Sequence, residues 1–264
     1  MAKRSAQFRA GILARLQRDS VVSVSGLART LGCSEMTVRR HLGRLETEGL
    51  LERQRGGAVA SRRVRLEFDL FEKSQSHRAQ KAAIGRAAAG LVRPGERVIL
   101  DTGTTTLAMA RELGTRDFGT AQAVSVVTTS LAIISELMHA RQIECILLGG
   151  TVRENSPDLY GPLVEDNLSR IHADRAFIGC DGISARGQLM TTDPRVARIT
   201  GLMIEQAERV VLLADSSKAG RNSFISFGRL EQLDTLITDQ AMPDDILTVA
   251  RDAGVETILV SISE

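Results

Sequence analysis

Residues 33–42 are Cys-Ser-Glu-Met-Thr-Val-Arg-Arg-His-Leu, and this stretch carries the clearest local indication of fold in the chain. Ser34 can cap the start of a helix and Gly49 can end one. The sequence therefore predicts a helix over Glu35–Glu48. Its expected buried side chains are Met36, Val38, Leu42 and Leu45. Among the other side chains are short hydroxyls and basic groups, which suit a polar partner.

The surrounding residues extend this pattern. Apolar residues at Phe8, Ile12, Leu13 and Leu16 predict a helix within the first 20 residues. Ser23 can cap a second short helix that Gly32 ends, and residues 50–59 have the pattern of two strands around a glycine turn. A helix, a helix-turn-helix and a hairpin together predict a small winged helix-turn-helix domain over residues 1–60.

A helix of this kind can place its first residues in the major groove of double-stranded DNA, where an arginine matches guanine. The hairpin would lie beside the duplex and contact phosphates. The alternative is that these polar side chains form an ordinary solvated surface. The expected DNA contacts are Ser34, Thr37, Arg39, Arg40, His41 and Arg44 on the helix, with Arg53 and Arg55 on the hairpin.

The charge is divided unevenly along the chain. The 264 residues hold 34 basic and 32 acidic side chains, a net charge of only +2. Residues 1–65 hold 14 basic and 5 acidic side chains, a net of +9, and residues 66–264 hold 20 and 27, a net of −7. A basic first part indicates an anionic partner such as DNA. The chain has no tryptophan and one tyrosine, which disfavours base stacking on single strands.

The remaining composition excludes several classes of protein. Three scattered cysteines and four scattered histidines disfavour a disulfide framework and a metal site. No apolar run approaches 18 residues, so no membrane span is expected. The first residues lack the apolar core of a signal peptide. We therefore expect a cytoplasmic protein without a metal or cofactor.

From residue 80 onward, apolar strands alternate with helices. This alternation predicts an α/β domain over residues 80–264, with a parallel sheet covered by helices on both faces, after a linker over residues 61–79. The predicted strands are Arg97–Leu100, Val124–Thr128, Ile143–Leu148, Arg175–Ile178, Val210–Leu213, Thr235–Thr238 and Thr257–Val260. The predicted helices are 80–92, 104–113, 130–141, 160–170, 195–207 and 243–253.

Several of these strands end in polar or glycine-containing turns. Ligands of parallel sheets bind at the carboxyl ends of the strands, and a helix start offers free N–H groups to a phosphate. The turn Asp101-Thr102-Gly103-Thr104-Thr105-Thr106 has this character, and Lys218 could add a positive charge. Each turn alone could also be ordinary capping. Neither a P-loop nor a GxGxxG motif is present, so ATP and dinucleotides lack support.

The first part of the chain resembles the DNA-binding signature of the DeoR family of bacterial transcriptional regulators. The matching stretches are Val24–Ala28, Cys33–Leu42, Leu45–Glu46, Gly49–Arg53 and Gly56–Ala58. Two residues depart from the family pattern. His41 stands where the family usually has an aspartate, and Gly26 stands where it often has a glutamate.

The resemblance continues through Asp101–Thr105, Leu148–Gly150, Phe177–Ile183 and Ala214–Lys218. It implies a sensor domain similar in fold to ribose-5-phosphate isomerase that binds phosphorylated sugars or related metabolites. The residues implied to line its pocket are Asp101, Gly103, Thr104, Thr105, Gly149, Gly150, Asp181 and Lys218. Val196 and Thr200 replace a usual glutamate and lysine, and Arg195 and Arg198 are possible substitutes.

The resemblance implies a repressor of a carbohydrate or related catabolic operon that a phosphorylated metabolite releases from operator DNA, although the sequence itself does not distinguish a repressor from an activator. We expect a dimer or tetramer assembled through residues 66–264. A sugar-phosphate isomerase is the alternative enzyme, but residues 188–204 contain no glutamate or lysine to act as base or electrophile. An effector-independent DNA binder would explain the basic part but not the phosphate-suited turns.

Overall fold

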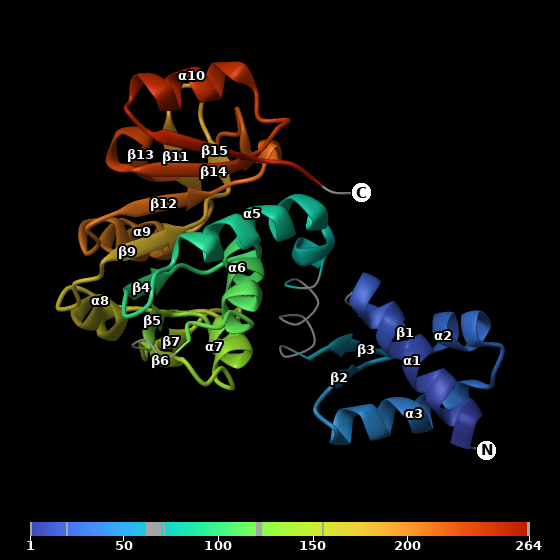
Figure 1. Ribbon diagram of the computed structural model, residues 1–264. Helices are drawn as coiled ribbons and strands as arrows, with labels where there is room; N and C mark the ends of the chain where they lie inside the picture. Colours follow the sequence, from blue (N-terminus) through green and yellow to red (C-terminus); the bar gives the residue numbers. More distant parts are fainter. Residues whose placement is uncertain are drawn as a thin grey trace. The chain divides into compact units, whose positions relative to one another are not determined.

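The computed structural model describes residues 2–19, 21–61, 70, 72–119, 123–154 and 156–262 (Figure 1). The chain forms two compact units, one of residues 1–73 with 154–156 and one of residues 74–153 with 157–264. We call residues 2–61 the head and residues 74–262 the body. Residues 62–69 and 71 of the predicted linker lie outside the described residues.

The head has three helices and a three-stranded antiparallel sheet in its described residues. The strands pair in the order β1-β3-β2, so the short strand β1 adds an edge to the predicted hairpin. Sequence reasoning missed β1 because it has only three residues. The elements are α1 (Ala2–Asp19), β1 (Val21–Ser23), α2 (Val24–Leu31), α3 (Glu35–Thr47), β2 (Leu51–Gln54) and β3 (Gly57–Ala60).

The two predicted caps fix the turn between α2 and α3. The Ser23 hydroxyl accepts a hydrogen bond from the Gly26 N–H, and the Ser34 hydroxyl accepts one from the Thr37 N–H. Gly32 ends α2 in the left-handed region, at φ 60°, which glycine adopts without strain. Ile12, Leu16 and Leu42 are fully buried where the helices meet. The expectation that Met36 is buried is wrong, since this side chain is 76% exposed.

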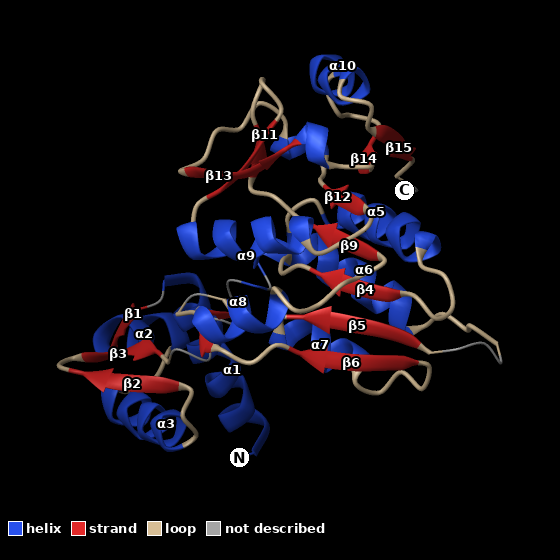
Figure 2. Cartoon of the chain, turned by 90° about the vertical axis from the view of Figure 1, so that its left-hand side faces the viewer, coloured by secondary structure: helices blue, strands red, loops and turns tan. Residues whose placement is uncertain are grey.

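The body is built on a seven-stranded parallel sheet with strand order β15-β14-β12-β9-β4-β5-β6 (Figure 2). All seven predicted strands are present, with ends that differ by at most one residue. They are β4 (Arg97–Leu100), β5 (Val124–Thr128), β6 (Ile143–Leu147), β9 (Arg175–Ile178), β12 (Val210–Leu213), β14 (Thr235–Asp239) and β15 (Glu256–Val260).

Helices cover both faces of this sheet, as predicted. Helix α5 packs on α6 and α6 on α7, while α8 packs on α9 across the other face (Figure 2). Strand β6 lies at the edge of the sheet, and its Ile146 and Leu147 are 40% and 38% exposed. The helices are α5 (Arg78–Leu91), α6 (Thr104–Gly114), α7 (Leu131–Leu137), α8 (Pro162–Leu168), α9 (Pro194–Glu205) and α10 (Asp244–Asp252).

Smaller antiparallel strands stand beside the main sheet, and the sequence pattern did not reveal them. Strands β7 (Thr151–Val152) and β8 (Leu159–Tyr160) pair with each other. A three-stranded sheet has the order β10-β11-β13. Its strands are β10 (Gly182–Ile183), β11 (Gln188–Thr191) and β13 (Ile225–Arg229). The body also has two short 3-10 helices, η1 (Ser216–Lys218) and η2 (Leu230–Gln232).

No helix in the described part of the chain has the length and apolar character that crossing a membrane requires.

Candidate functional site

Helix α3 turns one face into the head and the other to solvent. Its buried side chains are Val38, His41, Leu42 and Leu45. These positions follow the i, i+3, i+4, i+7 spacing of one helix face. Arg40 and Arg44 are exposed, and neither side chain makes a hydrogen bond or ion pair within the described residues. Two unpaired guanidinium groups on an exposed helix face can bind an anionic partner.

Three other predicted contact residues of α3 are partly engaged within the head. The Ser34 and Thr37 hydroxyl oxygens are 2.9 Å apart, and both groups complete the helix cap. Arg39 donates to the Glu35 carboxylate at 3.2 Å, one turn earlier in the helix. Both partners of this pair are about half exposed, so solvent and salt weaken their attraction.

His41 does not belong to the DNA-contact set. It is only 6% exposed, and its ring lies 5.6 Å from the Phe8 ring. Burial, followed by the positive charges of Arg40 and Arg44, lowers the pKa of His41. This residue packs helix α3 against helix α1 instead of reaching the surface, which corrects the sequence-based prediction.

The two hairpin arginines have different positions. Arg53 is half-buried. Its backbone N–H donates to the Glu46 carboxylate at 3.2 Å, and its side-chain Nη1 donates to the Arg39 backbone carbonyl at 3.4 Å. It therefore joins the hairpin to α3. Arg55 is exposed beside Gly56, which has a φ of 82° at the turn between β2 and β3. Of the two, Arg55 is the side chain available to a phosphate.

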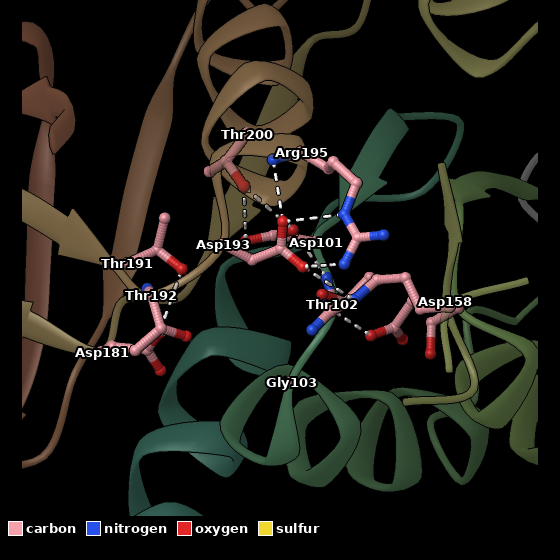
Figure 3. Close-up of polar contacts among 12 residues, drawn as sticks. Asp101, Thr102, Gly103, Asp158, Asp181, Thr191, Thr192, Asp193, Arg195 and Thr200 are labelled. Atoms are coloured by element: carbon pink, nitrogen blue, oxygen red, sulfur yellow. Dashed lines mark hydrogen bonds and ion pairs between the residues drawn. The ribbon is translucent and has the colours of Figure 1, made fainter. Parts of the chain in front are cut away.

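In the body, Asp101 lies directly after β4 and is 3% exposed (Figure 3). Its carboxylate accepts hydrogen bonds from the Thr102 N–H at 2.7 Å and the Gly179 N–H at 3.3 Å. The Thr200 hydroxyl lies 3.4 Å from both carboxylate oxygens. Burial raises the pKa of Asp101 to about 7, although these hydrogen bonds oppose the shift. Asp101 is thus poised to change its charge near neutral pH.

The turn after Asp101 offers fewer contact groups than expected. Gly103, at φ 129°, precedes the first residue of α6, and its carbonyl accepts a hydrogen bond from the Thr106 hydroxyl at 3.0 Å. Thr105 and Thr106 are buried at 8% and 1% exposure. Gly103 and Thr104 are the parts of this helix start that solvent reaches. A ligand at the turn would therefore contact these two residues.

A small pocket adjoins Asp101 and, as it stands, has room for about one water molecule. The fully buried Thr129 hydroxyl has no hydrogen-bond partner among the described residues, and Thr129 lines this pocket. A buried hydroxyl without a partner is unfavourable unless a ligand or water binds it. The lining residues are Asp101, Thr102, Thr129, Arg153, Asp158, Leu159, Tyr160, Val196 and Ile199.

Arg153 is the charged group of this pocket that the sequence did not single out. Its Nη1 lies 3.4 Å from an Asp158 oxygen, and its Nε lies 3.5 Å from an Asp193 oxygen. Asp158 is itself buried, at 5% exposure. These two ion pairs hold the positive charge of Arg153 in the pocket that Asp101 also lines. The residues around Arg153 contain no recognisable sequence motif.

The two arginines considered as substitutes for the missing family lysine are paired elsewhere. Arg195 forms a two-pronged pair with Asp193, with N–O distances of 3.0 and 2.7 Å, and its guanidinium lies 4.6 Å from the centre of the Tyr160 ring (Figure 3). Arg198 pairs with Glu165 at 3.2 Å. Arg195 contacts the pocket-lining Tyr160 and shares Asp193 with the pocket-lining Arg153, but neither Arg195 nor Arg198 lines the pocket itself.

Asp181 and Lys218 both lie near Cys180, and neither lines the pocket around Asp101. Asp181 accepts hydrogen bonds from the Thr191 hydroxyl at 3.0 Å and the Thr192 N–H at 3.1 Å. Burial raises the pKa of Cys180 to about 12, and the positive charge of Lys218 opposes that shift, so the lysine lies near this thiol. The Lys218 side chain makes no hydrogen bond or ion pair within the described residues. The sequence-predicted residues are therefore not all gathered around the pocket beside Asp101.

The predicted pair Gly149 and Gly150 does not line the pocket around Asp101. A β-carbon on Gly150 would lie 2.7 Å from the Tyr160 carbonyl and 2.6 Å from a Val164 methyl. Gly150 therefore lets strand β8 pass close to the end of β6. Gly149 is exposed with open space around it. No metal-binding cluster of histidine, cysteine and acidic residues is found among the residues that the structure describes.

Comparison with known proteins matches both units to one family. The model of the DeoR C-terminal sensor domain matches residues 76–240, and the model of the DeoR-like helix-turn-helix domain matches residues 9–64.

Similar proteins include named regulators. The chain is 34% identical to a putative aga operon transcriptional repressor of Escherichia coli O157:H7, over 97% of this chain and 94% of that protein. It is 37% identical to the regulator GlpR of Haloferax volcanii, over 89% of this chain and 90% of that protein. Among solved structures, ribose 5-phosphate isomerase A of Methanocaldococcus jannaschii matches with 24% identity and a TM-score of 0.39, over 53% of each chain.

Proposed function

The chain belongs to the DeoR family of helix-turn-helix transcriptional regulators, and we propose that it represses a carbohydrate-related operon until a phosphorylated metabolite binds its body. The head would hold operator DNA through α3, and the body would hold the metabolite. A ligand that binds one conformation of the body more tightly shifts the population toward that conformation.

The DNA-binding part of the proposal rests on Arg40 and Arg44, two exposed arginines of α3 whose side chains have no partner among the described residues. Each can offer its full guanidinium fork to a guanine or a phosphate, because no carboxylate in the described residues competes for it. Arg39 differs, since it is paired with Glu35. The excess of basic residues in positions 1–65 adds attraction toward the duplex.

The metabolite part is supported by groups that a polyol phosphate can satisfy. The buried Asp101 carboxyl and the unpaired Thr129 hydroxyl suit sugar hydroxyl groups. The unpaired Lys218 ammonium and the exposed start of α6 suit a phosphate. Because the pocket beside Asp101 is small, we propose that Arg153 and Tyr160 move outward as the metabolite enters.

The first test of the DNA-binding part uses Arg40→Ala in the full chain. A binding sequence is selected from random duplex DNA, and affinity is measured by fluorescence anisotropy. We expect Arg40→Ala to weaken binding by about 1–3 kcal/mol if the side chain contacts a base. Arg86→Ala, an exposed arginine of the body paired with Glu112, is the matched control and should change affinity little. An Arg40→Ala affinity equal to that of the control would remove Arg40 from the contact set.

We also propose that the body assembles the chain into a dimer or tetramer. The exposed apolar side chains of the edge strand β6 support this proposal, because an edge strand offers unpaired backbone groups and apolar area to a second copy. Sedimentation of the full chain would detect the oligomer.

The proposed body is a sensor and not an isomerase. Residues 188–204 supply no glutamate or lysine, and the structure places Thr200 beside Asp101, where it offers only a hydroxyl. Robust turnover of pentose phosphates by the full chain would overturn this part of the proposal.

A further inference from the structure

Met36 occupies an unusual place for a large apolar side chain. It is the second residue of α3 and is 76% exposed, among the most exposed large apolar side chains of the described chain. With a rotation of about 100° per residue in an α-helix, Met36 points about 170° away from the middle of the buried face formed by Val38, His41, Leu42 and Leu45. It therefore lies at the centre of the outward face.

The outward face continues from Met36 to two residues that define its shape. Arg40 lies one turn further along, where its guanidinium has no partner in the described residues. Gly43 follows, and a β-carbon placed there would meet nothing within 4 Å. The face thus presents an apolar side chain, a cation and then a flat surface, in that order from the start of the helix.

The first residues of a recognition helix are those that reach base edges in the major groove. The polar side chains around Met36 are engaged, since Ser34 bonds to Thr37 and Glu35 pairs with Arg39. Met36 has no hydrogen-bonding group of comparable strength, so it can gain only by burying apolar surface. The C5-methyl of thymine is the one methyl group that a base pair presents in the major groove, and it is the largest apolar group available there.

We propose that Met36 is a specificity-determining residue that selects a thymine in the operator by contact with its C5-methyl group. This inference rests on the proposed function. It assigns Met36 a task different from that of Arg40, which supplies charge and hydrogen bonds to the same groove.

The test replaces thymine with deoxyuridine, one position at a time, in a half-site selected by the natural chain from random DNA. Deoxyuridine keeps every hydrogen-bonding group of thymine and lacks only the methyl. For the natural chain we expect one position at which this change weakens binding about three- to fivefold, the value of burying one methyl group. For Met36→Ala, the same position should become insensitive to the methyl, while Met36→Leu should remain sensitive.

Met138→Ala is the matched control, because Met138 is also exposed, at 60%, but lies in the body. It should reproduce the deoxyuridine profile of the natural chain. Circular dichroism and thermal unfolding confirm that each variant is folded. Identical profiles for the natural chain and Met36→Ala, or a natural chain insensitive at every thymine, would overturn the inference while leaving the proposed function intact. A selection that enriches no sequence would instead contradict the proposed function, and the inference with it.

Discussion

Single residues in the body decide what the pocket can bind. Thr129 buries a hydroxyl without a partner beside the carboxyl of Asp101. In the free protein this costs stability, because a buried polar group has lost its bonds to water. In the proposed complex with a metabolite, we expect the same hydroxyl to gain a partner. One substitution at Thr129 should therefore raise the stability of the free protein and lower its affinity for the metabolite.

Thr129→Val keeps the shape of the side chain and removes the hydroxyl. We expect the free protein to become more stable by about 1 kcal/mol, because the unpaired buried group is gone. We also expect metabolite binding to weaken, because the ligand loses a hydrogen bond. Chemical unfolding and a thermal-shift titration measure the two effects. Loss of stability in the free protein would show that Thr129 has a partner after all.

Asp101 should make the stability of the body depend on pH. Its pKa is raised from 3.8 to about 7, so the folded state holds a proton that the unfolded state releases. The stabilisation is fully present below about pH 4 and is lost as pH rises through 7. Relative to Asp101→Asn, the natural chain should lose on the order of 1 kcal/mol of unfolding free energy per pH unit between pH 5 and 7.

Asp174→Asn is the control for this pH series. Hydrogen bonds and charge from Arg97 lower the pKa of Asp174 to about 2, so its stabilising effect is present above about pH 4 and is lost only as pH falls toward 2. The cost of Asp174→Asn should therefore be constant between pH 5 and 8. Urea unfolding at several pH values tests both. A difference between Asp101→Asn and the natural chain that is also constant with pH would contradict the raised pKa.

At the scale of elements, helix α5 packs closely against α6 because Gly85 has no side chain. A β-carbon on Gly85 would lie 2.6 Å from the Met109 nitrogen. Gly85→Ala should therefore destabilise the body by about 1–3 kcal/mol through overpacking. Gly90→Ala in the same helix, where a β-carbon meets nothing within 4 Å, should instead gain up to about 1 kcal/mol. Thermal unfolding compares the two, and equal effects would contradict the close approach.

The elements that the sequence predicted well have a strong local pattern. Strands such as β12, with four consecutive buried apolar residues, are continuous apolar runs between turns. The caps Ser23 and Ser34 act locally on the N–H three residues later, so the sequence alone indicates them. The two-residue strands β7, β8 and β10 carry no such pattern, because their pairing depends on partners that the fold brings together.

The site was harder to predict for the same physical reason. Arg153 and Asp158 line the pocket, and Arg153 also pairs with the distant Asp193, but no motif or spacing in the sequence indicates this arrangement. The predicted burial of Met36 and the predicted exposure of His41 are both wrong, although the helical spacing by itself indicates the observed arrangement. The strict helical spacing of Val38, Leu42 and Leu45 includes position 41 and excludes position 36, but residue type favoured burying the methionine and exposing the histidine.

At the scale of the whole molecule, the small net charge conceals two opposite parts. Residues 1–65 carry a net charge of +9 and residues 66–264 a net charge of −7. The first part has the charge to bind DNA. Its affinity should fall as the salt concentration rises, because the release of counterions from the DNA then contributes less free energy. Under the proposed function, the second part would attract an anionic metabolite by local means, from the Lys218 ammonium and the start of α6, against an unfavourable overall charge.

The central claim is that a metabolite in the body controls DNA binding by the head. The most direct measurement titrates a panel of sugar phosphates into the complex of the full chain with its selected operator, at fixed salt, and follows DNA release by anisotropy. We predict that one compound releases the DNA, and that Lys218→Ala shifts this titration to higher concentration without changing operator affinity. An operator affinity unchanged by every compound, including those that raise the melting temperature of the chain, would contradict the account.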